Sequence, residues 1–230
     1  MTRNPNSLRS DPADRPKKRG PYDSGQMGER RRRMIAVAKE MIAESGGEGF
    51  TIRDLTRRAG VSVTVVYSAY GDKEGLLAAA IRDFYDNLPL ARRRPATTLD
   101  RMLREIDAAA RIILENRAYS RAVAQLYFSP TADDRIYRTI REIAVVTFLP
   151  WLESAGARGE TAPGVPIEAL TSTLANDRWG VIFDWARDRV PDDALAKTMR
   201  TSFLVAAAGA TIGDARREVE AALVPLWSIT

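Results

Sequence analysis

Residues Thr51–Leu77, TIRDLTRRAGVSVTVVYSAYGDKEGLL, predict two short helices joined by a tight turn and followed by the start of a third helix. Thr51 can cap the first helix, and Asp54 three residues later makes the acidic version of a capping box. The helix over Ile52–Ala59 repeats apolar residues at spacings of three and four, which buries one face. Gly60 allows the sharp turn that follows, because a Cβ resists left-handed backbone. The pattern is that of a helix-turn-helix.

Ser62 can cap the second helix of this unit, whose inward positions are Val61, Val66 and Tyr70. In helix-turn-helix units the second helix lies in the DNA major groove, and its N-terminal residues meet base edges. The sequence therefore predicts a DNA-binding unit.

Histidine and cysteine are both absent from the 230 residues. The chain thus lacks the side chain most often used as a general base near neutral pH, and it has no thiolate nucleophile or ligand. This argues against zinc enzymes, Ser-His-Asp hydrolases and Cys-His enzymes. We expect no catalytic residue, no metal and no cofactor, and hence no enzyme.

Positive charge is concentrated in the N-terminal third. Residues 1–73 hold 15 of the 35 Lys and Arg but only 9 of the 30 Asp and Glu. This asymmetry indicates a nucleic-acid or membrane partner for that part. No apolar segment of a secretory signal follows the first charges, and no run approaches the roughly eighteen apolar residues of a membrane span. We expect a soluble, cytoplasmic protein.

Residues 1–27 combine prolines with Ser, Asn, Asp, Gly and scattered Arg, and too few apolar residues to order by themselves. We expect a disordered basic arm. Its cluster Arg15–Arg19 fits a solubilising tail, and it equally fits an arm that follows phosphates or enters a minor groove.

The rest of the chain predicts helices and no strand, so the fold class is all-α. The helix-turn-helix domain should span residues 28–75, and a second helical domain residues 76–230. Beyond the short helices, we expect helices over about 27–45, 72–88, 98–116, 118–128, 132–155, 166–189, 191–209 and 212–228. Pro150 should kink or break the helix in which it lies.

Arg30 to Arg33 cover the first turns of the helix over 27–45. Positive charge at a helix N-terminus opposes the helix dipole, at a cost of about a few tenths of a kcal/mol per charge. A nearby polyanion would reverse the sign of that cost. We therefore favour phosphate contact, with Arg31 as the candidate, over a merely solvated charged face.

Several elements, in their order and spacing, resemble the TetR/AcrR family of bacterial transcriptional regulators over about residues 30–77. A basic first helix is followed by Gly49-Phe50-Thr51, Ala59-Gly60-Val61-Ser62, Tyr67, Tyr70, Lys73-Glu74 and Leu76-Leu77. The remaining chain matches only as an all-helical domain of the right length.

The resemblance implies a homodimer in which each helix-turn-helix reads one half of a palindromic operator on double-stranded DNA. It also implies that residues 76–230 form a regulatory and dimerisation domain, which holds a small-molecule effector whose binding releases the DNA. The family pattern further places phosphate contacts at Thr51, Tyr67 and Lys73. The function it implies is that of a repressor.

Two residues depart from the family pattern: Val63 stands where the family often has Lys, and Thr64 where it often has Gly. The exposed edge of the second helix then has no Arg for guanine and no Asn or Gln for adenine, and suits thymine methyl contacts, hydroxyl contacts and shape readout. We expect Arg53 and Arg57, on the outer face of the preceding helix, to supply charged contacts. The predicted DNA-contacting residues are Arg31, Thr51, Arg53, Arg57, Ser62, Val63, Thr64, Val65, Tyr67, Ser68 and Lys73.

A ligand pocket, as the resemblance implies, should lie between the helices over 98–189. Its candidate lining residues, each of which is also explained by plain core packing, are Met102, Ile106, Tyr127, Phe128, Phe148, Trp151 and Asn176. Arg111, Arg117 and Arg178 could serve an anionic ligand, although arginines on helices are usually solvated.

The dimer seam in this family commonly comes from the last two long helices, paired across the two-fold axis into a four-helix bundle. Here the candidates are the helices over 166–189 and 191–209, whose small residues would permit close approach. Their expected seam residues are Trp179, Ile182, Phe203, Leu204, Ala207 and Ala208.

Two functions of other classes compete with a repressor that responds to a hydrophobic ligand. An enzyme would need a site made of carboxylates alone, but Asp133-Asp134 and Asp192-Asp193 are better explained as helix caps, and a Gly-rich phosphate loop is missing. An architectural DNA-binding protein without small-molecule input would be favoured by a packed second domain without a pocket.

Overall fold

The computed structural model describes residues 21–46, 49, 51–89 and 94–227. Ten α-helices follow one another in this part of the chain, and its only β structure is an isolated antiparallel bridge between Thr161 and Thr211. The prediction of an all-α fold is confirmed. None of the helices described is long and apolar enough to cross a bilayer.

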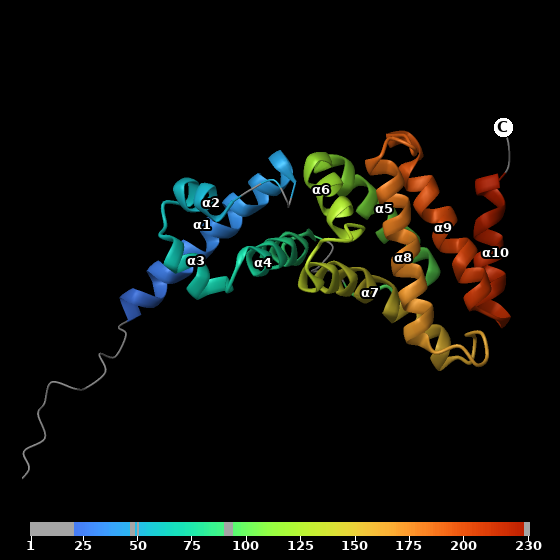
Figure 1. Ribbon diagram of the computed structural model, residues 1–230. Coiled ribbons are helices and arrows are strands. Elements are labelled where there is room, and N and C mark those ends of the chain that lie inside the picture. Colours follow the sequence, from blue (N-terminus) through green and yellow to red (C-terminus); the bar gives the residue numbers. More distant parts are fainter. Residues whose placement is uncertain (1–20, 47–48, 50, 90–93, 228–230) are drawn as a thin grey trace, which may run out of the picture.

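The helices form two units, which we call the head and the body (Figure 1). The head contains α1 (Pro21–Ser45), α2 (Ile52–Ala59) and α3 (Val63–Tyr70), and α4 (Lys73–Asp86) leads out of it. The body contains α5 (Leu99–Glu115), α6 (Arg117–Tyr127), α7 (Asp134–Ala157), α8 (Ile167–Ala186), η2 (Asp192–Ala194), α9 (Leu195–Ala210) and α10 (Gly213–Trp227).

Helix α1 begins at Pro21, before the expected start at Met27. Proline is favoured at the first position of a helix for two reasons. An N–H at that position would have no partner within the helix, so its absence costs nothing, and the φ of proline is already helical. The predicted disordered arm is therefore wrong for residues 21–26. Residues 1–20, with the basic cluster Arg15–Arg19, lie outside the described residues.

The head packs α2 and α3 around the apolar face of α1. Met34 and Ile42 of α1, Leu55 of α2 and Val66 of α3 are fully buried. Their spacing puts one face of each helix into a common core, so that the opposite face of α3 is left on the surface. The head thus holds α3 rigidly while leaving one side of it accessible.

Helix α4 packs on both units, against α1 of the head and α7 of the body. Its buried residues are Leu76, Leu77, Ala80 and Ile81. Lys39 of α1 forms an ion pair with Asp83 at 2.8 Å, and the Tyr119 hydroxyl of α6 donates to the Ala80 carbonyl oxygen at 3.5 Å. A displacement of α4 relative to the body would therefore displace the head as well.

Helix α7 runs without a break from Asp134 to Ala157, although Pro150 lies inside it. Proline removes the N–H that would bond to the carbonyl oxygen of Val146, four residues earlier. Val146 is 63% exposed, so water can reach this turn of the helix. Of the two expected effects, a break is wrong, because the lost bond falls on an exposed turn, while a kink stays a prediction.

The body stacks α7, α8, α9 and α10 side by side, with α10 outermost (Figure 1). Phe148 and Trp151 of α7 meet Phe203 of α9, with ring centroids 5.6 and 5.3 Å apart. Pairs of this kind add to the stability that burial of the rings provides. The helix expected over 191–209 is divided into two parts, a short 3-10 helix, η2, and the α-helix α9 that follows it.

Candidate nucleic-acid interface and ligand cavity

Side-chain caps and one left-handed glycine set the geometry of the α2–turn–α3 unit. The Thr51 hydroxyl accepts from the Asp54 backbone N–H at 3.2 Å and donates to the Asp54 carboxylate at 2.9 Å. This hydrogen bond from Thr51 holds the pKa of Asp54 below its ordinary value. Gly60 has φ 62° and ψ 41°, and the Ser62 side chain then caps α3 by accepting from the Val65 N–H at 3.4 Å. The turn chemistry predicted from the sequence is present.

The exposed edge of α3 carries Ser62, Val63, Thr64, Tyr67 and Ser68. Val63 is 43% and Tyr67 49% exposed, so both side chains are accessible to a partner. Val65, which was predicted to lie on the same edge, is half-buried and packs against the core. Val65 stands next to the fully buried Val66 at the inner boundary of the helix, and its contact with DNA stays a prediction.

Basic side chains flank this edge. Arg53 and Arg57, four residues apart and so on one face of α2, are exposed, as is Arg31 of α1. Arg57 forms an ion pair with Asp54 on its own helix, while its side chain stays 71% exposed. Lys73 at the start of α4 is half-buried, and Thr51 is exposed at the start of α2. The arrangement presents positive charge, together with the N-termini of α2 and α4, to a polyanion.

Arg135 of the body forms a hydrogen bond with the residue that caps α4. Asp72 caps α4 by accepting from the Gly75 N–H at 2.8 Å, and Asp133 caps α7 by accepting from the Arg135 N–H at 2.8 Å. The Arg135 guanidinium donates to both carboxylates, at 2.8 Å to Asp72 and 2.9 Å to Asp133. Its hydrogen bonds hold the pKa of each carboxyl below the ordinary value. This Arg135 bridge joins the N-termini of α4 and α7.

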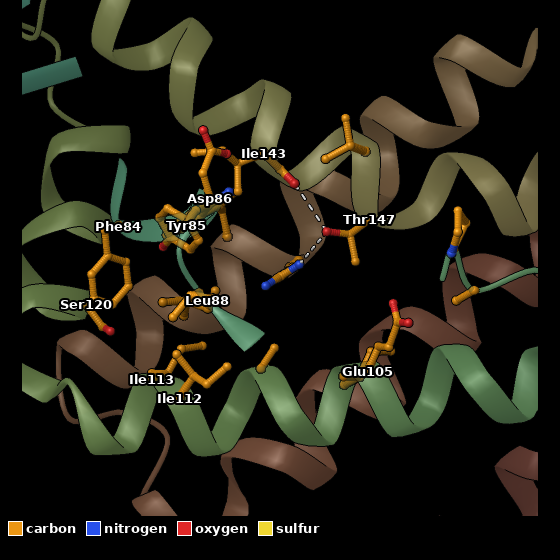
Figure 2. A pocket seen from close by; sticks show the side chains of 18 of the residues that line it. Phe84, Tyr85, Asp86, Leu88, Glu105, Ile112, Ile113, Ser120, Ile143 and Thr147 are labelled. Atoms are coloured by element: carbon orange, nitrogen blue, oxygen red, sulfur yellow. Dashed lines mark hydrogen bonds between the residues drawn. The ribbon is translucent and has the colours of Figure 1, made fainter. Parts of the chain in front are cut away.

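A cavity of about 320 Å³ lies between α4, α5, α6, α7 and α8. In Figure 2, Ile112, Ile113 and Glu105 project from α5, with Ile143 and Thr147 across from them on α7 and Tyr85 on the α4 side. The remaining lining is largely apolar and includes Phe84, Leu88, Pro95, Ala96, Ile106, Ala109, Val146, Pro150, Trp179 and Ile182. Both its size and its apolar walls are typical of small-molecule sites.

The predicted pocket residues agree with this cavity only in part. Ile106 lines it, and Phe148 with Ile106 lines a much smaller hollow beside it. Met102 and Trp151 are buried core, Phe128 is exposed, and Tyr127 donates to the side-chain oxygen of Asn176 at 2.8 Å. The pocket was predicted to lie between the helices over 98–189, and this prediction missed the wall that α4 supplies. The adjacent aromatic residues Phe84 and Tyr85 at the end of α4 could have indicated that wall.

Several polar or charged side chains stand among the apolar walls: Arg82, Tyr85, Asp86, Arg94, Glu105, Ser120, Thr147 and Arg178. Burial raises the pKa of Tyr85 to about 12 and lowers the pKa of the Arg178 guanidinium. Glu105 is 12% exposed and lies 3.5 Å from the Nε of Arg101. Within the described ranges, no group of acidic side chains is arranged to hold a metal ion.

The predicted dimer seam lies inside a single chain. Trp179, Ile182, Phe203, Leu204 and Ala207 are each at most 4% exposed, and Ala208 is half-buried. The first five are thus largely covered within one chain, and Trp179 and Ile182 also line the cavity. The accessible face of α9 instead presents Val205, which is 54% exposed, and Gly209.

Comparison with known sequences finds relatives of the head. The family model described as bacterial regulatory proteins, tetR family, matches residues 34–80. The HTH-type transcriptional regulator BetI of Escherichia coli O139:H28 is 41% identical over 64 residues, 28% of this chain. That match spans 33% of the BetI chain.

Comparison with solved structures extends the likeness to the body. TylP, a TetR regulator from Streptomyces fradiae, has a TM-score of 0.61 at 17% identity and covers 89% of this chain and 90% of its own. Thermus thermophilus FadR, a TetR family transcriptional repressor solved in complex with lauroyl-CoA, has a TM-score of 0.59 at 18% identity, over 78% of this chain and 94% of its own. At such identities the likeness concerns the fold alone.

Proposed function

Since the chain belongs to the TetR family of bacterial regulatory proteins, we propose that it is a cytoplasmic transcriptional repressor, released from a palindromic DNA operator by a small hydrophobic ligand. One observation carries the proposal: α4 joins the exposed helix-turn-helix directly to the largely apolar cavity, to which it contributes Phe84 and Tyr85. FadR, with the same fold, holds lauroyl-CoA, an apolar chain with a polar group, which supports a ligand of hydrophobic character. An architectural DNA-binding protein would not need such a cavity.

In this proposal α3 enters the major groove, and its exposed edge reads the bases through methyl and hydroxyl contacts. Thr51, Arg53, Arg57, Tyr67 and Lys73 then bind phosphates, together with Arg31. Phosphate contacts position the protein, whereas base contacts carry the sequence preference. The apolar character of Val63 implies that thymine methyl groups and DNA shape contribute much of the specificity.

Arg57→Ala is expected to weaken binding to all DNA sequences and to reduce the slope of log affinity against log salt by about one, since one phosphate contact is lost. Thr64→Ala is expected to leave the salt slope unchanged and to alter preference at a single base pair, worth about 1–3 kcal/mol. Fluorescence anisotropy on operator and random duplexes, at several salt concentrations, separates the two. Equal losses on both duplexes for both variants would contradict this division of roles.

We also propose a homodimer in which the accessible faces of α8 and α9 meet across a two-fold axis. Gly209 would let the helices approach closely, and Val205 offers an exposed apolar side chain beside it. Val205→Glu is expected to yield monomers in sedimentation at micromolar concentration. Val63→Glu places the same side chain on the exposed edge of α3, and should leave the dimer intact. A wild-type monomer would contradict the proposal.

Induction would follow from a rigid shift of α4 when a ligand fills the cavity. The shift would change the separation of the two heads in the dimer, so that both could no longer meet successive major grooves. Distances between spin labels on the two heads, recorded with and without ligand, test this step. An unchanged separation would refute it.

The proposed function as a whole is tested by footprinting on the protein's own promoter region, repeated with a panel of hydrophobic ligands. A palindromic footprint that one ligand releases is the expected result. Protection without sequence preference, unaffected by every ligand, would favour the architectural alternative.

A further inference from the structure

Arg178 on α8 is a charged side chain that lines the cavity without an ionic partner. Its Nη1 donates to the Thr147 hydroxyl at 3.2 Å, while its buried Nε has no hydrogen-bond partner. Across the residues that the structure describes, no carboxylate oxygen lies within 4 Å of its nitrogens. Burial lowers the pKa of the Arg178 guanidinium despite the attraction of Tyr85 and Glu105, so its charged form is still disfavoured there. Its position is explained if an anion joins it.

The other candidate arginines of the body differ from Arg178. Arg117 forms an ion pair with Asp192 and is half exposed, and Arg111 is exposed on α5. Neither lines the cavity. Arg178 also makes a cation–π contact, because its guanidinium carbon lies 6.0 Å from the centre of the Phe148 ring. A positioned cation facing a hollow is an arrangement that binds an anion.

Glu105 lies across the cavity and is the alternative to Arg178 as the charged group that binds the ligand. As a carboxylate it would favour a cationic ligand. Its carboxylate is already compensated, because the Nε of Arg101 lies 3.5 Å away. Figure 2 shows Glu105 on α5 facing the level of Thr147, the residue to which Arg178 donates. At this level of the cavity Arg178 is therefore a positive charge that forms no ion pair among the described residues, although Glu105 attracts it.

We propose that the ligand of this cavity is an amphipathic monocarboxylate whose carboxylate pairs with Arg178 while its apolar body packs against the aromatic and aliphatic walls. The inference rests on the proposed function, since it names the chemical class of the proposed ligand. A cavity of about 320 Å³ leaves room for an apolar body and headgroup of at least about ten non-hydrogen atoms, at ~30 Å³ each. Arg178 sets the charge of the ligand, and the walls set its size.

Calorimetric titration of the full-length protein with octanoate, 1-nonanol and nonylamine tests the charge preference at matched size. Octanoate is expected to bind at least about ten-fold more tightly than the alcohol, and the amine more weakly than either. In Arg178→Met the affinity for octanoate should fall about 100-fold, whereas the affinity for nonanol should stay within about three-fold. Arg178→Lys keeps the charge and should retain part of the preference. Arg111→Met, the matched control, should behave as the wild type.

Thermal unfolding without ligand gives a second, independent reading. Arg178→Met removes a charge that burial disfavours and that forms no ion pair among the described residues, so the melting temperature should rise by about 2–4 °C. A merely structural arginine would give the opposite sign. A lower melting temperature, equal affinities for octanoate and nonanol, preference for the amine, or no binding of octanoate would each overturn the proposal.

The two proposals fail in distinguishable ways. The titrations contain no DNA, so their failure leaves the DNA-binding function standing with a ligand of another class. Conversely, a protein that binds octanoate through Arg178 but leaves no footprint on DNA would remove the repressor and keep the carboxylate site.

Discussion

Leu55→Ala is expected to unfold the head and abolish operator binding while the body stays folded. Leu55 is fully buried where α2 meets α1, so its truncation leaves a cavity that the small head can scarcely refill. Substitutions of this kind cost about 2–5 kcal/mol, a large part of the stability of a unit of this size. Urea unfolding followed by circular dichroism should show an early transition for the head, and calorimetry should show unchanged ligand binding in the body.

Val63→Ala provides the matched control for this variant. Val63 is 43% exposed, so its truncation should change the free energy of unfolding by no more than about 0.5 kcal/mol. In the proposed interface it should nevertheless reduce operator affinity, because an apolar base contact is lost. If Leu55→Ala melts as the wild type does, the assigned core of the head is wrong.

Arg135→Ala is expected to uncouple ligand binding from DNA release. The Arg135 bridge ties α7, which lines the cavity through Ile143, Val146, Thr147 and Pro150, to the N-terminus of α4 directly after α3. Ligands in allosteric proteins change the affinity for a second partner typically by 5–150-fold. Without the bridge that factor should fall at least about five-fold, while ligand affinity alone changes little. Anisotropy titrations of operator DNA with and without ligand measure both quantities.

Arg138→Ala is the control for Arg135→Ala. Arg138 lies one turn further along α7 and is exposed, and its Nε donates to the Asp134 carbonyl oxygen of its own helix at 3.3 Å. It should release DNA with ligand as the wild type does. Full ligand response in Arg135→Ala would show that the signal passes through α4 alone.

The features predicted correctly from the sequence are those that neighbouring residues decide. Thr51, Gly60 and Ser62 specify caps and a turn through bonds within a few residues, and the apolar spacing of α1 specifies its buried face. The start of α1 was missed because Pro21 was taken as a sign of disorder rather than as a first helical residue.

The cavity and the surface of the body could not be predicted in the same way, because they depend on which helices meet. Periodicity marks Met102, Trp151 and Ile106 alike as inward, yet only Ile106 reaches the cavity. Whether Trp179 or Val205 faces outward is decided by the order in which α7, α8 and α9 stack. Likewise the lone charge of Arg178 becomes visible only when the neighbours on other helices are known.

Pro150 gives α7 the mechanics of a lever. The missing backbone hydrogen bond makes this turn the softest point of the helix, and it lies in the wall of the cavity. Arg135 stands fifteen residues away, which at 1.5 Å per residue is an arm of about 22 Å. A change in direction of about 10° at Pro150 would thus move the far end by ~4 Å at the start of α4, about three-quarters of the pitch of a helical turn. A small ligand in the cavity could therefore displace the start of α4 by more than it displaces the residues that it contacts.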